Sequence, residues 1–82
     1  MKPNSNASKI LKYVYLKNKP VSSIEISKDL GIQRNHIGSF SRYLVSRAIL
    51  KMVLKNRISY YHISPYSKNY VKQTLEDLEN EE

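Results

Sequence analysis

The stretch richest in hydrogen-bonding side chains lies between residues 33 and 42. It combines guanidinium, carboxamide, imidazole and hydroxyl groups, carried by Gln33, Arg34, Asn35, His36, Ser39 and Arg42. An arginine can donate two hydrogen bonds to the O6 and N7 atoms of guanine, and an asparagine or glutamine pairs in the same way with adenine. The cluster is therefore suited to reading the edges of nucleic-acid bases. The simpler alternative is an ordinary solvated helix face.

Catalytic and metal-binding chemistry finds little support in the sequence. The chain has no cysteine, which excludes disulfide bonds and thiolate metal sites. The two histidines, His36 and His62, are far apart in the sequence and have no third ligand nearby. No carboxylate pair, nucleophile–base pair or phosphate-binding loop is visible. We therefore expect no enzymatic activity, no metal ion and no cofactor.

The distribution of charge indicates a polyanionic partner. Of the seven acidic residues, five lie among the last seven positions, so residues 1–75 carry 14 basic and two acidic residues, a net charge of +12. So basic a body attracts nucleic acid, although positive charge can also serve solubility alone. No apolar run has the length of a membrane span, and the N-terminal residues lack the apolar centre of a signal peptide. We expect a cytoplasmic protein without membrane contact.

The chain of 82 residues is long enough for one domain with a thin core. Domains of this size often gain stability from a second subunit when disulfides and metals are absent, so a homodimer is expected. Within the single domain 1–82, we expect a flexible start at 1–7 and a folded core at 8–64. A C-terminal helix at 65–79 and an acidic tail at 80–82 complete the expected organisation.

Hydrophobic periodicity predicts a first helix at about 7–18, capped by Asn6 or Ser8. The lysine before Pro20 disfavours helical backbone, so the helix ends there. A short extended segment around Val21 could add a strand to a sheet formed by later residues.

Two signals agree on a second helix at about 23–30. Ser22 and Glu25 have the spacing of a capping box, in which the serine oxygen accepts from the third helical N–H and the glutamate reaches back. Gly31 stands where a left-handed residue commonly ends a helix. A third helix is then expected from about residues 33–35 to Arg47. Its buried stripe is marked by Ile37, Phe40 or Ser41, and Leu44.

Residues 50–63 change to a period of two, which predicts a β-hairpin with a two-residue turn at Asn56 and Arg57. In that register, position 50 pairs with 63, 52 with 61 and 54 with 59. One face is largely apolar and is expected to lie on the core: Leu50, Met52, Leu54, Ser59, Tyr61 and Ile63. Ser64 and Pro65 then form a clear helix start.

Two helices joined by a short turn that contains glycine form a helix-turn-helix, and here a hairpin follows at once. The motifs are L-G-I-x-x-x-x-I at 30–37, L-V-x-x-x-I-L at 44–50 and Y-Y-x-I at 60–63. On these motifs, residues 8–64 resemble the winged helix-turn-helix family of DNA-binding transcriptional regulators. The expected fold class is mainly α with a small β-hairpin, a winged helix-turn-helix with an added C-terminal helix.

The resemblance implies a sequence-specific regulator of transcription, a repressor or an activator, that binds double-stranded DNA as a homodimer. The recognition helix 34–47 would enter the major groove with the polar cluster described above. The wing at 50–63 would touch the flanking backbone through Lys55, Asn56 and Arg57. Half-sites should lie about 34–36 Å apart. No small-molecule ligand is expected. The alternative is a winged-helix interaction module that binds protein, RNA or DNA without specificity.

The last helix is more apolar than a lone terminal helix needs to be. Members of the family commonly dimerise through a terminal helix, so its apolar residues could pair across a two-fold axis: Tyr66, Tyr70, Val71, Leu75 and Leu78. The alternative is that this face folds back on the core of its own chain.

The chain departs from the family pattern at three positions of the third helix. Gln33 stands where a serine, threonine or aspartate cap is usual. Ser41 stands where leucine is frequent, and Phe40 could fill the space. Gly38 costs about 1 kcal/mol relative to alanine within a helix. A tight helix–helix contact or a close approach to DNA would explain this glycine.

Overall fold

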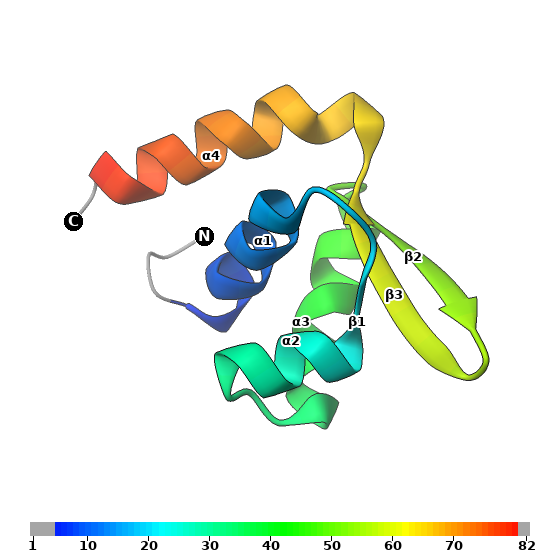
Figure 1. Ribbon diagram of the computed structural model, residues 1–82. Helices are drawn as coiled ribbons and strands as arrows, with labels where there is room; N and C mark the ends of the chain where they lie inside the picture. Colours follow the sequence, from blue (N-terminus) through cyan, green and yellow to red (C-terminus); the bar gives the residue numbers. More distant parts are fainter. Residues whose placement is uncertain (1–4, 81–82) are drawn as a thin grey trace.

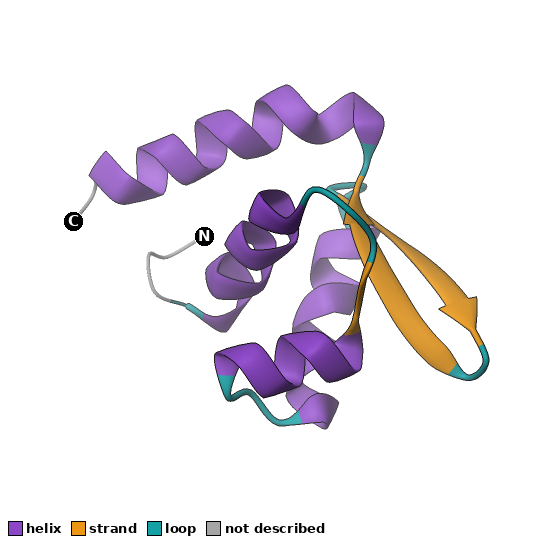
Figure 2. Cartoon of the chain, in the orientation of Figure 1, coloured by secondary structure: helices purple, strands orange, loops and turns teal. Residues whose placement is uncertain are grey.

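The computed structural model describes residues 5–80, which form four α-helices and one small antiparallel sheet (Figure 1). In chain order the elements are α1 (Asn6–Lys17), β1 (Val21–Ser22), α2 (Ser23–Leu30), α3 (Arg34–Ser46), β2 (Leu50–Lys55), β3 (Ile58–Ile63), a 3₁₀ turn (Pro65–Ser67) and α4 (Lys68–Asn80). The predicted fold class, a winged helix-turn-helix with an added C-terminal helix, is confirmed. Figure 2 shows the hairpin of β2 and β3 projecting away from the helices.

α1 starts earlier than the sequence pattern indicated. Ser5 is its N-cap, because the Oγ atom of Ser5 accepts a hydrogen bond of 3.2 Å from the backbone N–H of Ser8. The prediction of Asn6 or Ser8 as the cap was therefore wrong, and Asn6 is helical although a flexible start was expected there. Ala7, also within the flexible start expected at 1–7, is helical as well, and residues 1–4 of it lie outside the described part of the chain. Asn18, with a φ of 53°, ends the helix in the left-handed conformation.

α2 has the bounds and the caps that its sequence predicts. The Oγ atom of Ser22 accepts from the backbone N–H of Glu25 at 3.1 Å, and a Glu25 carboxylate oxygen accepts from the Ser22 N–H at 3.4 Å. Gly31 has a φ of 68° and ends the helix. The hydroxyl of Ser27 donates to the carbonyl oxygen of Ile32 at 2.6 Å, which ties α2 to the turn that follows it.

The core lies where α1, α2, α3 and the base of the sheet meet. Ile26 of α2 and Ile37 of α3 are both fully buried, and Leu30 packs against the same cluster. The cluster of buried apolar side chains consists of Ile10, Leu11, Val14, Val21, Ile26, Ile32, Ile37, Leu44, Ile49, Leu50, Tyr61, Ile63 and Val71. The cluster includes residues of every helix. Because Ile26 before the turn and Ile37 after it are both buried in this cluster, the position of α2 relative to α3 is fixed by the core.

The sheet has the predicted register and the predicted third strand. Leu50 pairs with Ile63, and β1 joins through the pairing of Val21 with Tyr61, which gives the strand order β1-β3-β2. The turn residues Asn56 and Arg57 have φ values of 52° and 65°. Two successive positive φ angles are the geometry of a type I′ turn, which matches the right-handed twist of a hairpin.

The expectation that one whole face of the hairpin lies on the core was wrong for its outer half. Leu50, Tyr61 and Ile63 are buried, but Met52 is 49% exposed and Leu54 is 66% exposed. The reason is length: β2 and β3 extend beyond the ends of the helices, so only the base of the hairpin finds a surface to pack on (Figure 1).

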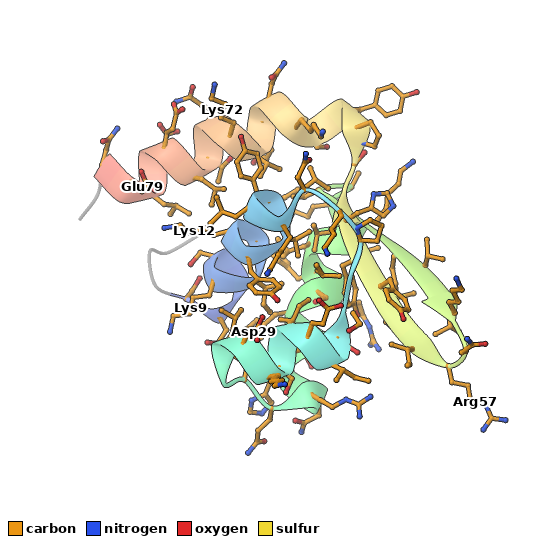
Figure 3. The ribbon with its side chains drawn as sticks, in the orientation of Figure 1. Lys9, Lys12, Asp29, Arg57, Lys72 and Glu79 are labelled. Atoms are coloured by element: carbon orange, nitrogen blue, oxygen red, sulfur yellow. The ribbon has the colours of Figure 1, made fainter. Side chains whose placement is uncertain are left out.

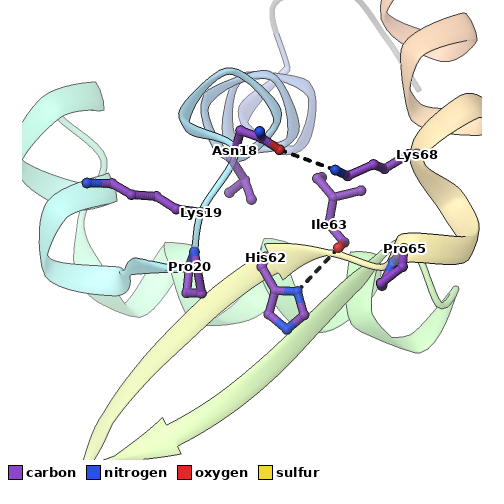
Figure 4. A pocket seen from close by; sticks show the side chains of 8 residues that line it. Asn18, Lys19, Pro20, His62, Ile63, Pro65 and Lys68 are labelled. Carbon is purple, nitrogen blue, oxygen red and sulfur yellow. Dashed lines mark hydrogen bonds between the residues drawn. The ribbon is translucent and has the colours of Figure 1, made fainter.

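α4 folds back over α1 of its own chain. Val71 is fully buried and Leu78 is largely buried. A polar contact lies at each end of the helix pair: Lys12 and Glu79 form an ion pair at 3.7 Å (Figure 3), and the Lys68 ammonium donates to the side-chain oxygen of Asn18 at 3.4 Å (Figure 4). The last helix begins at Pro65 as predicted, but its first turn is 3₁₀ rather than α.

Among residues 5–80, no helix combines the length and the apolar character that crossing a membrane requires.

Ser41 occupies an unfavourable position in α3. It is fully buried, and its Oγ atom has no hydrogen-bond partner among the described residues. An unpaired buried hydroxyl costs about 1–3 kcal/mol of desolvation. We therefore expect Ser41→Ala to raise the free energy of unfolding by about 1 kcal/mol, measured by urea denaturation. A less stable variant would show that the hydroxyl has a partner in solution.

A tyrosine–carboxylate contact joins α1 to α2. The Tyr13 hydroxyl donates to the carboxylate of Asp29 at 2.5 Å. This hydrogen bond first, then burial and the negative charge of Asp29, raises the pKa of Tyr13 to about 12 from an ordinary value of 10.0. Because the folded-state pKa is the higher one, the contact stabilises the fold fully below about pH 10 and loses its effect as the pH rises towards 12.

We expect Tyr13→Phe to lower the free energy of unfolding by about 0.5–1 kcal/mol at pH 7, because the contact is largely solvated. Urea denaturation at a series of pH values should show this difference shrinking between pH 10 and pH 12. Tyr66→Phe, at a side chain that is 94% exposed, is the matched control and should show no such difference. A deficit that stays constant to pH 12 would contradict the assignment.

Candidate nucleic-acid interface

The polar cluster lies on the solvent side of α3. Its members are all exposed: Gln33, Arg34, Asn35, His36, Ser39 and Arg42. The opposite side of the helix carries the fully buried stripe of Ile37, Ser41 and Leu44. At 3.6 residues per turn, Asn35 and Ser39 lie almost directly across the helix from that stripe. The structure therefore presents as one surface the side chains that the sequence analysis selected.

Local hydrogen bonds orient two of these side chains. The Asn35 side-chain oxygen accepts from the backbone N–H of His36 at 3.0 Å, and the Ser39 hydroxyl lies 3.4 Å from the Asn35 carbonyl oxygen. The carboxamide of Asn35 can still donate outward through its NH₂ group, and its oxygen has a second lone pair. Both functions that adenine recognition needs are thus available at the first turn of α3.

The N-terminal end of α3 is electrostatically open to an anion. Gln33 occupies the N-cap position but makes no side-chain capping bond, and the first turn contains no acidic residue. The His36 N–H has partners in Gln33 and Asn35, but the backbone N–H groups of Arg34 and Asn35 have none among the described residues, and the helix dipole places partial positive charge there. Arg34 adds a full charge at the same end.

We call the hairpin of β2 and β3 the wing, and its tip is polar and basic. Lys55, Asn56 and Arg57 are all exposed, and Figure 3 shows Arg57 at the outermost point of the wing. Neither α3 nor the hairpin contains an acidic residue. The acidic residues of α4 lie on the other side of the molecule from the start of α3 (Figure 1). The acidic side chains of α4 are therefore remote from the start of α3, although α4 and the adjacent α1 also carry lysines.

An open cleft separates α3 from the wing. It is lined by Gly38, Arg42 and Val45 from the helix and by Met52, Ser59 and Tyr61 from the hairpin. Among the predicted site residues only Arg42 belongs to it. Gly38 and Met52 were not selected as site residues. The sequence did offer a signal for each of them. Gly38 is a glycine in a helix interior, and Met52 is an apolar residue in the outer half of a hairpin.

The last turn of α3 carries an additional pair that the sequence analysis did not select. The guanidinium of Arg47 lies 5.0 Å from the centre of the Tyr43 ring, a cation–π contact between two exposed side chains. The pair extends the basic surface of α3 beyond the predicted cluster.

The five residues predicted for a dimer interface do not lie on one surface. Tyr66 is 94% exposed and Tyr70 is 60% exposed, whereas Val71 and Leu78 are buried against α1 and Leu75 is half-buried. The helix therefore uses its apolar stripe within its own chain. The two tyrosines, Tyr66 in the 3₁₀ turn and Tyr70 in α4, stay exposed.

The two histidines lie in different surroundings. His36 is exposed on α3, and His62 is half-buried beside Pro20 and Lys19 in a pocket near the ends of α1 and β3 (Figure 4). Its Nδ1 atom lies 3.2 Å from the carbonyl oxygen of Ile63. Within residues 5–80, no three side chains of the kinds that bind metal ions come together.

No protein-family model matches this sequence, and comparison with curated proteins gave no match. Solved structures do match. AF1382 from Archaeoglobus fulgidus aligns over 96% of this chain and 90% of its own, with a TM-score of 0.79 and 13% sequence identity. A transcriptional regulator homologue from Pyrococcus horikoshii aligns over 94% of this chain and 79% of its own, with a TM-score of 0.77 and 19% identity.

The transcriptional regulator BldR from Sulfolobus solfataricus is also similar, with a TM-score of 0.76 and 18% identity. The alignment covers 92% of this chain but 55% of BldR, so this chain spans about half the length of that regulator. At such identities the likeness establishes the fold.

Proposed function

We propose that this protein, whose fold is that of winged-helix transcriptional regulators, binds double-stranded DNA in a sequence-specific manner and regulates transcription. The observation that carries the proposal is the surface of α3. Its hydrogen-bonding side chains are all exposed, Asn35 and Ser39 lie opposite the buried stripe, and no acidic residue interrupts the set. The likeness to structures described as transcriptional regulators supports the same function.

The proposed mode of binding places α3 in the major groove, which is wide enough to admit one helix. Arg34, Asn35 and Ser39 would face base edges, while Gln33 and His36 flank them at the start of the helix. The wing would lie along the flanking backbone, where Lys55 and Arg57 suit phosphate oxygens and Asn56 shapes the turn. Base contacts would give specificity, and the basic wing would give affinity that depends on salt.

Selection of bound duplexes from a random pool tests the function directly. We expect wild-type protein to enrich one sequence class over random duplex at moderate salt. For that duplex, Asn35→Ala should weaken binding by about 1–3 kcal/mol and relax the preference at one base position. The matched control is Lys55→Ala, which should weaken binding to all duplexes alike and lower the salt slope by about one.

Equal affinity of the wild type for every duplex, or a uniform effect of Asn35→Ala, would exclude specific readout. The second candidate function, an interaction module, would then stand. It is favoured by the apolar residues Met52, Val53 and Leu54, which are exposed along β2. A module of this kind should retain its partner when α3 is altered and lose it when Leu54 becomes lysine.

We also propose that the protein acts as a homodimer through α4, with the exposed Tyr66 and Tyr70 at the two-fold axis. A closed two-fold interface uses the same surface patch on both subunits. The two tyrosines of one subunit would therefore pack against the same two tyrosines of the other. Sedimentation velocity should show a wild-type dimer. Tyr70→Glu should give a folded monomer with weakened binding to a two-half-site duplex, and Tyr70→Phe should remain dimeric. A wild-type monomer at all accessible concentrations would refute this arrangement.

A further inference from the structure

Gly38 is a residue of α3 whose type the protein's own structure does not explain. Its backbone is helical, and the positive φ that would demand glycine occurs at Gly31 instead. Apart from its chain neighbours and the backbone of α3 itself, a Cβ atom built at Gly38 would meet no atom of the described residues within 4 Å, so no neighbouring element requires the missing side chain. This excludes the tight helix–helix contact within the chain as its reason. Glycine nevertheless weakens the helix relative to alanine. The open space beside it is where a bound molecule could approach the helix.

The open space beside Gly38 belongs to the cleft between α3 and the wing. Arg42 lies one turn further along the same side of the helix and lines the cleft, while Ser59 and the 49% exposed Met52 face it from the hairpin. The charged member of the lining set is Arg42. The cleft therefore offers a guanidinium, a hydroxyl and an apolar side chain around a stretch of helix surface that no side chain covers.

We propose that this cleft holds one sugar–phosphate strand of the bound duplex, an inference that rests on the proposed function. A protein that places a helix in one groove and a hairpin on the adjacent flank must straddle the strand that separates them. Arg42 and Ser59 donate to the phosphate oxygens of that strand, and Met52 contacts a deoxyribose. Gly38 lets the strand approach the helix backbone, where any side chain would hold it away.

The assignment changes the expected role of one predicted residue. Arg42 was selected with the base-reading cluster, but its place in the cleft makes it a phosphate ligand. Asn35 and Ser39 stay on the outermost surface of α3. Affinity and specificity are then divided along the length of α3, with specificity at its first turns and affinity where the helix faces the cleft.

Gly38→Ala tests the proposal, because it separates stability from binding. The substitution should raise the midpoint of urea unfolding, since alanine favours the helix and meets open space. It should also weaken binding by about tenfold, and by the same factor for the selected duplex and for random duplex. Ser41→Ala is the matched control, because it changes the buried side of the same helix and should leave both affinities unchanged.

The outcomes separate this proposal from the proposed function. If the wild type binds duplex specifically and the more stable Gly38→Ala protein binds as tightly, the cleft is not a strand site although the function stands. A loss confined to one base position would place a base edge at Gly38 and overturn the assignment. Absence of duplex binding by the wild type would remove the proposed function itself.

A second measurement uses duplexes in which single phosphates are replaced by neutral methylphosphonates. At the phosphate in the cleft, this replacement should weaken wild-type binding and have little further effect on Arg42→Gln. At other phosphates, the loss of affinity caused by the methylphosphonate and the loss caused by Arg42→Gln should add. Additivity at every phosphate position would overturn the assignment of Arg42.

Discussion

The arrangement of the interface depends on the packing of α2 against α3, which buries Ile26 and Ile37 in one apolar cluster. Both side chains are fully buried, and the turn between their helices is fixed by Gly31 and by the bond from Ser27 to Ile32. Because each residue turns a helix by about 100°, burial of Ile37 dictates which side chains of α3 face solvent. If α3 were rotated by one residue about its axis, polar side chains would be buried without hydrogen-bond partners. The desolvation free energy lost would exceed what small shifts of side chains could restore. Core packing between two helices thus sets the direction of the hydrogen-bonding surface.

The wing depends on the same core at one end and on a local turn at the other. An isolated two-stranded hairpin is marginally stable in water, so its base must be held by other elements. Leu50, Tyr61 and Ile63 bury that base, and β1 pairs with β3 beside it. The outer half has cross-strand pairing and the type I′ turn for support. A firm base with a projecting end lets the basic tip reach a surface that α3 cannot touch.

Features that depend on neighbouring residues were predictable from the sequence, and features that depend on distance in space were not. The capping box of α2, the left-handed Gly31 and the hairpin register follow from spacing along the chain. Alternation in the hairpin shows which side of β2 faces inward but not where the helices end, so the exposure of Met52 was missed. The amphipathic pattern of α4 fits a dimer and an intramolecular contact equally well. Exposure of the α3 cluster was predictable from helical period, whereas the cleft needs the separation between helix and wing.

The departures from ideal helix design gather in α3. α1 and α2 have side-chain caps at their first turns and left-handed residues after their last turns. α3 has an N-cap without a capping bond, a glycine in its interior and a buried hydroxyl that finds no partner within residues 5–80. Nothing in the structure explains Ser41. The other two departures leave backbone N–H groups and bare helix surface open on the side that faces outward. Sequences that satisfy local rules elsewhere commonly break them where a ligand binds. α3 draws its stability from tertiary packing, which leaves its exposed side available for recognition.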